Sequence, residues 1–296
     1  MEPIVENPAP ANRDSFAITE YQVRALGDLQ RADRDRYLCA LAAPAALRAD
    51  LVTLYAFNAE LAGIADKVSE TMLGLIRLQW WRDALADVAA GRGHRHHLVQ
   101  DLAELAARHQ LTLGLLNSLI DARERDVEAR QPADLAELET YAAATAGTLC
   151  ELALEICVRQ PKAEWRAVAR LAGTAYGLVG IARATPYLVR HRRIMLPAQE
   201  MSAAGLSPDL LLEMKPGPAI RPVLEQVSGR AAGLLAAARK QRLPRQAIAA
   251  LFPGRLAAAQ LERLRRDGYD PFAAGSSAPS GLNIWRLISA RCLGHI

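Results

Sequence analysis

The stretch YLCALAAPAALRADLVTLYAFNAELAGIADKV, from Tyr37 to Val68, decides the fold class of this chain. Alanine and leucine dominate it, and both residue types lose little side-chain freedom in a helix. Pro44 interrupts the pattern near its start, because proline is poorly tolerated in the interior of a helix. The stretch therefore predicts a short helix, a break at Pro44 and then a long helix.

The following stretch, SETMLGLIRLQWWRDALADVAAG, predicts another helix with Ser69 as its N-cap and Gly91 at its end. Four apolar residues recur in it at helical spacing and should face a core. They are Leu78, Trp81, Leu85 and Val88. Trp80 and Trp81 could instead line an apolar cavity, although an apolar stripe at this spacing usually belongs to a core.

The rest of the chain continues the helical pattern. The small residues from Ala142 to Gly147 favour close contact with another helix, and the stretch 164–185 is the expected neighbour. That neighbour should end before Pro186, because the residue preceding a proline avoids the helical region. Ser207-Pro208-Asp209 indicates a further helix start, and LNIWRLISARC (282–292) predicts the last helix.

The amino-acid composition agrees with a helical protein that has a sizeable hydrophobic core. The chain has 296 residues, of which 51% are hydrophobic, 23% charged and 5% aromatic, enough for a sizeable core. No hairpin signals occur, so we expect an all-α fold, with residues 1–16 as a disordered tail and residues 17–296 as one helical domain.

Charge and hydropathy exclude several classes of protein. The net charge of +4 suits an acidic partner or an anionic surface, but no nucleic-acid-binding motif is present. No run reaches the roughly 18 apolar residues that span a bilayer, and no secretory signal is visible. We therefore expect a cytoplasmic protein without a transmembrane segment.

Neither the cysteines nor the histidines form a metal-binding pattern. The four cysteines are widely spaced without a CxxC pair, which predicts small core residues rather than a zinc site or disulfides. They are Cys39, Cys150, Cys157 and Cys292. Three histidines lie in the glycine-flanked stretch GHRHHL, where solvated side chains are more typical than metal ligands. They are His94, His96 and His97.

The stretch IARATPYLVRHRRIMLP, from Ile181 to Pro197, is strongly basic. No carboxylate occurs between Glu164 and Glu200, so the stretch suits an anion that is bound without a metal. Its arginines predict either an anion site near a helix end or a patch that is solvated or faces a partner. The arginines concerned are Arg183, Arg190, Arg192 and Arg193.

Four segments together resemble the squalene/phytoene synthase superfamily. They are YAFNAELAGIAD, RLQWWR, ETYAAATAGT and RATPYLVRHRRIMLP, in the family's order and spacing. The resemblance implies a single bundle of the isoprenoid-synthase type around a central cavity. In active members, carboxylates on two facing helices hold Mg²⁺, which grips the diphosphates of two prenyl substrates that are joined head to head.

This chain departs from the first acidic motif of that family. Tyr55 matches the motif, but Ala59 stands at its arginine position, and Ala62 and Gly63 replace the paired aspartates. Asp66 is the one acid of the motif that survives.

The second acidic motif is lost almost entirely. Its places hold Gly177, Gly180, Arg183, Ala184 and Leu188, so Arg183 alone persists. Mg²⁺ prefers several oxygen ligands, and the chain keeps too few to form a cage for it. We expect no cofactor, with Mg²⁺ required only if the chain is an enzyme after all.

The chain resembles more closely a non-catalytic branch of the superfamily, that of the mitochondrial complex I assembly factor and its bacterial relatives. The matching segments include DRDRYLCALAAPAALR, KVSETMLGLIRLQWWRDAL, ARERDV and RATPY followed by RRIMLP. The resemblance implies a pseudoenzyme that helps to mature NADH:quinone oxidoreductase. Its partner would be a complex I subunit or an assembly intermediate, and it would attach peripherally to the inner membrane.

A remnant pocket and two alternative functions complete the expectations. The remnant pocket should contain Tyr55, Asp66, Arg77, Arg183 and Tyr187. Asp66 should bind a ligand or, more typically for a lone acid, pair with an arginine such as Arg48 or Arg77. Glu60 should face elsewhere, and the charged stretch 121–128 should be a solvated face. The alternative functions are an active prenyl transferase with unusual ligands and a carrier of an isoprenoid or other lipid.

Overall fold

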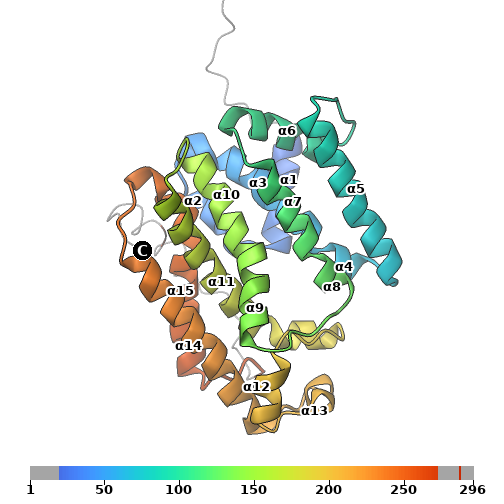
Figure 1. Cartoon of the computed structure of the whole chain (residues 1–296), viewed down its shortest axis with the longest axis vertical. Coiled ribbons are helices and arrows are strands. Elements are labelled where there is room, and N and C mark those ends of the chain that lie inside the picture. Colours follow the sequence, from blue (N-terminus) through green and yellow to red (C-terminus); the bar gives the residue numbers. More distant parts are fainter. Residues whose placement is uncertain (1–19, 273–286, 288–296) are drawn as a thin grey trace, which may run out of the picture.

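The computed structural model describes residues 20–272 and residue 287, and every regular element among these residues is helical (Figure 1). The predicted all-α class is confirmed. The tail expected at residues 1–16 lies outside the described residues, as does the last predicted helix apart from the buried Leu287.

Nine α-helices lie between residues 20 and 142, the first half of the described chain. They are α1 (Glu20–Ala32), α2 (Arg34–Ala42), α3 (Ala45–Ala62), α4 (Ile64–Lys67), α5 (Thr71–Ala89), α6 (His97–His109), α7 (Leu113–Ala122), α8 (Glu124–Val127) and α9 (Leu135–Ala142). A π-helical turn, Ala143–Gly147, joins α9 to the second half of the described chain.

The second half contains one very long helix and its neighbours. The α-helices are α10 (Thr148–Cys157), α11 (Ala163–Arg190), α12 (Ala198–Ala203), α13 (Pro208–Leu212), α14 (Ile220–Arg239) and α15 (Phe252–Arg266). Two 3₁₀ segments, Gly217–Ala219 and Arg245–Leu251, precede α14 and α15.

The stretch that predicts the fold class folds as expected. Pro44 is the N-cap residue of α3 with extended backbone angles, so α2 and α3 are separate helices. Asp33 fixes the start of α2, because its carboxylate accepts a hydrogen bond of 3.0 Å from the backbone N–H of Arg36.

Helix α5 confirms the predicted core stripe and corrects its start. Leu78, Trp81 and Leu85 are buried, and Gly91 adopts a left-handed conformation (φ 66°) just after the helix ends. The N-cap is Glu70 rather than the predicted Ser69, although its side chain makes no capping bond.

Helix α11 does not end before Pro186, as the sequence predicts, but continues to Arg190. Proline removes one helical hydrogen bond, which a single turn can lose when the rest of the helix is held by packing. The buried side chain of Val189 lies beyond the proline and anchors the last turn. Tertiary packing therefore overrides the local signal.

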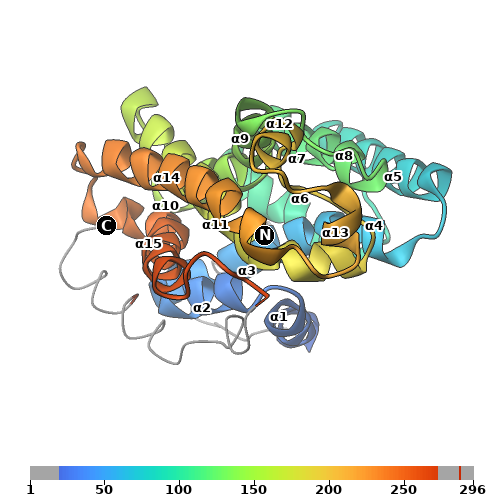
Figure 2. The same ribbon diagram turned by 90° about the horizontal axis from the view of Figure 1, so that it is seen from below.

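Figures 1 and 2 place α11 inside the bundle, next to α10, α14 and α15, all of which it contacts. It also packs against the π-helical turn Ala143–Gly147, as the run of small residues predicts. A Cβ atom added to Gly173 of α11 would lie 2.3 Å from the backbone oxygen of Ala146. Backbone therefore packs directly against backbone at this crossing.

The described cysteines are free thiols, in agreement with the expectation of no disulfide. Cys39 and Cys150 are buried and Cys157 is partly buried. Burial raises the pKa of Cys150 and of Cys157 to about 12, so both remain protonated core residues at neutral pH.

Between residues 20 and 272, no helix is both long enough and apolar enough to cross a membrane.

The crossing at Gly173 can be tested by substitution. Gly173→Ala should lower the free energy of unfolding by about 1–3 kcal/mol, because the new methyl group would clash with backbone that cannot move aside. Gly180→Ala on the same helix is the matched control, since a Cβ at Gly180 meets nothing within 4 Å. That control should stabilise the protein by up to about 1 kcal/mol through helix propensity. Urea unfolding measures both, and equal effects would contradict the close crossing.

Candidate functional site

A cavity of about 490 Å³ opens between α3, α4, α8, α9 and the C-terminal end of α11. Its polar wall combines tyrosines with acidic, basic and amide side chains from segments far apart in the sequence. These residues are Arg31, Asp33, Asn58, Asp66, Arg123, Asp126, Tyr141, Tyr187 and Arg193. Most of the remaining wall is apolar, so the cavity joins a charged side to an apolar side.

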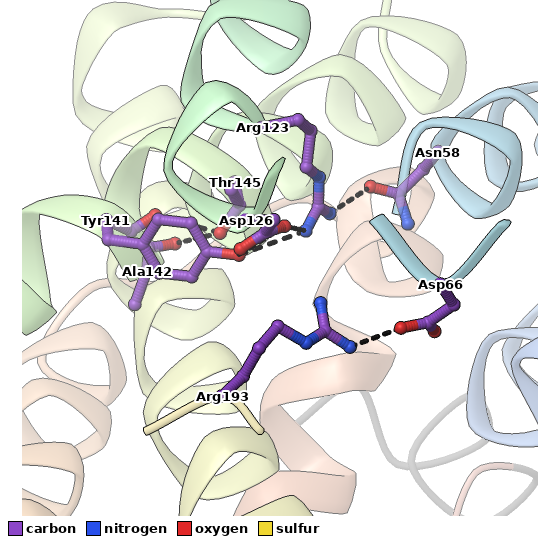
Figure 3. A network of polar contacts seen from close by, with 8 residues as sticks. All are labelled: Asn58, Asp66, Arg123, Asp126, Tyr141, Ala142, Thr145 and Arg193. Atoms are coloured by element: carbon purple, nitrogen blue, oxygen red, sulfur yellow. Dashed lines mark hydrogen bonds and ion pairs between the residues drawn. The ribbon is translucent and has the colours of Figure 1, made fainter. Parts of the chain in front are cut away.

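Arg123 is the centre of the inner polar cluster (Figure 3). Its guanidinium donates hydrogen bonds to the carboxylate of Asp126 (2.9 Å) and to the side-chain oxygen of Asn58 (3.1 Å). Tyr141 accepts a third bond from Arg123 (3.1 Å) and donates its own hydroxyl proton to Asp126 (2.7 Å). The cluster thus ties α3, α8 and α9 together behind the cavity.

Burial shapes the ionisation of this cluster. It disfavours the charge of Arg123, but the neighbouring Tyr141 and Asp126 outweigh that effect and raise the pKa of Arg123. Burial, together with the negative charge of Asp126, also raises the pKa of the Tyr141 hydroxyl. Arg123 therefore remains a cation and Tyr141 a hydrogen-bond donor at neutral pH.

Asp66 forms a second cluster at the rim of the cavity. Its carboxylate pairs with Arg193 and accepts a hydrogen bond of 2.9 Å from the hydroxyl of Tyr187. Burial and the hydrogen bond to Asp66 raise the pKa of Tyr187, so its hydroxyl stays protonated. Figure 3 shows Arg193 and Arg123 reaching into the same space from opposite sides.

The turn after α11 decides which arginine enters the cavity. Arg192 has a left-handed backbone conformation (φ 58°), which is uncommon for a residue with a Cβ atom. The backbone N–H of Arg193 then bonds to the oxygen of Leu188 (2.9 Å), folding the chain back over the helix end. Arg193 points inward as a result, while Arg190 and Arg192 are exposed.

Asp66 pairs with an arginine, as expected, but the arginine is Arg193 and neither Arg48 nor Arg77. Arg48 bonds to the backbone oxygen of Ala43 (3.0 Å), and Arg77 is exposed on α5. Arg193 belongs to the cavity rather than to the external basic patch. In both cases the residue that completes the ion pair lies in a distant segment of the sequence, which helical spacing does not predict.

Three residues of the expected remnant pocket do not line the cavity. Tyr55 is buried in the core, where burial raises its pKa and its hydroxyl has no partner among the described residues. Arg183 lies elsewhere on α11 and pairs with Asp35 at 3.3 Å. Arg77 is the third, so the structure brings only Asp66 and Tyr187 of the expected five into the cavity wall.

Sequence reasoning missed the inner cluster altogether. The stretch 121–128 is solvated at Asp121 and Glu128, as expected, but Arg125 and Asp126 are buried. The available signal was the alternation of acidic and basic residues in ARERDV, which allows local ion pairs. Nothing in the sequence indicated that Tyr141 and Asn58 would complete the cluster.

The positions of the two lost acidic motifs also face this cavity. Ala62 and Gly63 line it from the end of α3, and Ala184 and Leu188 line it from α11. None of these side chains carries an oxygen. Two acidic motifs at these positions would supply carboxylates to the cavity. In this chain the same walls are apolar.

The remaining carboxylates do not fit a Mg²⁺ site. Each of the three that line the cavity is paired with an arginine: Asp33 with Arg36 (2.7 Å), Asp66 with Arg193, and Asp126 with Arg123. Mg²⁺ would have to displace these cations and still lack carboxylates for near-octahedral coordination. Among residues 20–272, no group of three or more His, Cys, Asp or Glu side chains is placed to hold a metal.

The histidine-rich loop has an aromatic environment instead. The rings of His94 and His96 lie 5.4 and 5.3 Å from the ring of Trp80, measured between centroids, in edge-to-face contacts. These contacts hold the loop against the C-terminal half of α5.

The sequence profile described as squalene/phytoene synthase matches residues 29–286 of this chain. The rat protein named "NADH dehydrogenase (ubiquinone) complex I, assembly factor 6" is 32% identical over 247 residues, which are 82% of this chain and 74% of that protein. The human protein of the same name is 32% identical over 203 residues, 69% of this chain and 61% of that protein.

Solved structures of the isoprenoid-synthase type share the fold. A dehydrosqualene synthase in complex with a ligand superposes with a TM-score of 0.79 at 17% identity, covering 92% of this chain and 95% of that one. A squalene synthase from Alicyclobacillus acidocaldarius gives a TM-score of 0.71 at 20% identity, covering 85% and 97%. At these identities the similarity establishes the fold alone, and it confirms the expected type of bundle.

The inner cluster makes a stability prediction. Arg123→Met should lower the free energy of unfolding by about 3–5 kcal/mol, because Asp126 would be left buried without its cation. Arg221→Met is the control: it removes an arginine from an exposed pair with Glu225 and should change stability by less than about 0.5 kcal/mol. Urea unfolding at neutral pH measures the difference. A loss below about 1 kcal/mol in Arg123→Met would show that the cluster does not stabilise the fold.

Proposed function

The chain belongs to the squalene/phytoene synthase family, and we propose that it acts as a non-catalytic member in the assembly of respiratory complex I, NADH:quinone oxidoreductase. The observation that carries this proposal is its similarity to proteins named complex I assembly factor 6, at 32–34% identity in rat, cow and human. Its partner would be a complex I subunit or an assembly intermediate.

The cavity supports the non-catalytic part of the proposal. A metal-dependent prenyl transferase must stabilise a diphosphate leaving group, which Mg²⁺ held by several carboxylates does well. In this chain, Arg193 forms an ion pair with the carboxylate of Asp66, and Arg123 forms one with the carboxylate of Asp126. Guanidinium groups can bind phosphate, but these two would first have to leave their own carboxylates.

The volume of the cavity favours a second candidate function. About 490 Å³ lies within the usual range of small-molecule sites, and much of the wall is apolar. A lipid or isoprenoid could therefore be held without being transformed. Because the wall charges are already paired, the cavity suits an uncharged group better than a diphosphate.

The proposed target is membrane-associated, and we propose that the protein works beside it, on the cytoplasmic side of the inner membrane, as a peripheral protein. The exposed basic turn at the end of α11 is a suitable contact surface. Arg190 and Arg192 have no ion-pair partner among the described residues, so they are available to an acidic surface of the partner.

Complementation of a deletion strain tests the role in assembly. Deleting the gene should lower NADH:quinone oxidoreductase activity in membranes, and the wild-type gene should restore it. Arg190→Gln/Arg192→Asn should restore it at least about twofold less well, because charges at a contact surface speed association. Asparagine at position 192 tolerates the left-handed backbone.

The matched control is Arg159→Gln/Arg242→Gln, which removes two exposed arginines elsewhere on the protein. It should complement like the wild type. Normal complex I activity in the deletion strain would overturn the proposed function, whereas full complementation by the Arg190/Arg192 variant would discard this turn as the contact surface.

Incubation with substrate tests the absence of catalysis. Purified protein given farnesyl or geranylgeranyl diphosphate and Mg²⁺ should release no squalene or phytoene, because its cavity lacks the ligands for a metal-bound diphosphate. Chromatography of the extracted lipids measures the product. Steady product formation that disappears in Asp66→Ala would establish an active prenyl transferase instead.

A further inference from the structure

One helix carries most of the exposed large apolar side chains of the described residues. Met72, Leu73, Ile76 and Trp80 of α5 are 63%, 46%, 56% and 39% exposed. Residues 72, 76 and 80 are each one helical turn apart, and residue 73 flanks them, so the four form one stripe on one face. We call this set of four residues the α5 stripe.

The stripe is not a badly packed part of the core. The opposite face of α5 is buried through Leu78, Trp81 and Leu85, so the helix is already anchored without the stripe. Figure 1 shows α5 at the outer edge of the bundle. Apolar side chains on such a projecting helix form a ridge rather than a groove.

Trp80 is held at one end of the stripe. Its ring makes edge-to-face contacts with Trp81, His94 and His96 at centroid distances of 4.9, 5.4 and 5.3 Å. Tryptophan with one face packed and one face exposed is typical of side chains that sit at the boundary between lipid and water.

Positive charge surrounds the stripe. Arg77 lies on α5 itself, and Arg95 follows in the loop that contacts Trp80; both are exposed without an ion-pair partner among the described residues. Helix α4 contacts α5, and its Asp66 is bound by Tyr187 and Arg193 at the end of α11. The end of α11, which the turn with Arg190 and Arg192 follows, therefore lies beside α4, the helix that precedes α5.

Negative charge on this edge is smaller. Glu70 and Asp83 are the exposed acids of α5 and its N-cap, and Asp83 accepts a hydrogen bond from Gln79 at 2.8 Å. Among these charged groups, which have no ion-pair partner in the described residues, the four arginines therefore outnumber the two carboxylates. An apolar ridge with a boundary tryptophan and excess positive charge matches a helix that lies in the surface of an anionic bilayer.

We propose that the α5 stripe is the surface through which this protein docks on anionic phospholipid membranes. The proposal rests on the peripheral attachment proposed above and adds the surface that carries it. The stripe would enter the boundary between head groups and acyl chains, while Arg77 and the neighbouring arginines contact lipid phosphates. Tyr187, 48% exposed at the cavity rim, lies next to this edge, so docking would bring the cavity close to the lipid.

Vesicle binding tests the proposal with the full chain. The wild type should bind phosphatidylcholine vesicles that contain about 30% phosphatidylglycerol, and should bind pure phosphatidylcholine vesicles and high-salt samples more weakly. Met72→Glu/Ile76→Glu should lower the apparent affinity at least about tenfold, because two charges would have to enter the apolar layer. Both positions are exposed, so the thermal melting temperature should not change.

The control is Leu210→Glu, which introduces one glutamate, half the added charge of the double variant, at an exposed leucine on α13 and should leave binding unchanged. Failure of the wild type to bind anionic vesicles, or equal binding by Met72→Glu/Ile76→Glu, would overturn the proposal. If vesicles are not bound but the double variant fails to restore complex I activity, the stripe contacts a protein and not lipid. Normal complex I activity in the deletion strain would refute the proposed role in assembly. It would not affect the conclusion drawn from vesicle binding.

Discussion

Arg123 and Asp126 form an ion pair whose side chains are only 12% and 10% exposed, and the polar cavity beside them depends on such pairing. A buried carboxylate is costly unless a cation and hydrogen bonds compensate its charge. Each acid in the cavity wall meets this requirement with its own arginine, whether on the same element or from a distant one. The bundle can therefore keep a charged cavity between its helices without a metal ion to balance it.

The same pairing changes what the cavity can do. Ala62, Gly63, Ala184 and Leu188 leave its walls without carboxylates at the places where the family's acidic motifs fall. The acids that remain are paired with arginine side chains. These cations are part of the chain, so they cannot dissociate and be replaced as a bound metal ion can. The fold of the isoprenoid-synthase type is preserved, while each carboxylate of the cavity wall is paired with an arginine.

On the outer surface, local backbone geometry separates side chains that are adjacent in sequence. The left-handed conformation of Arg192 sends Arg193 to Asp66 and leaves Arg192 exposed. On α5, helical spacing buries Leu78, Trp81 and Leu85 and exposes Met72, Leu73, Ile76 and Trp80. The cavity and the basic turn therefore lie at the C-terminal end of α11, and the apolar ridge lies on α5, which contacts α4 of the cavity wall.

The sequence by itself determined the helical class, the break at Pro44 and the close crossing at Ala143–Gly147. All of these follow from composition or from residues near one another in the chain. Only the tertiary structure decided that Asp66 pairs with Arg193, which is 127 residues away, that Asp126 is buried, and that α11 continues past Pro186. The physical reason is that periodicity records which face of a helix is apolar, whereas the partner of a charge depends on how distant helices pack.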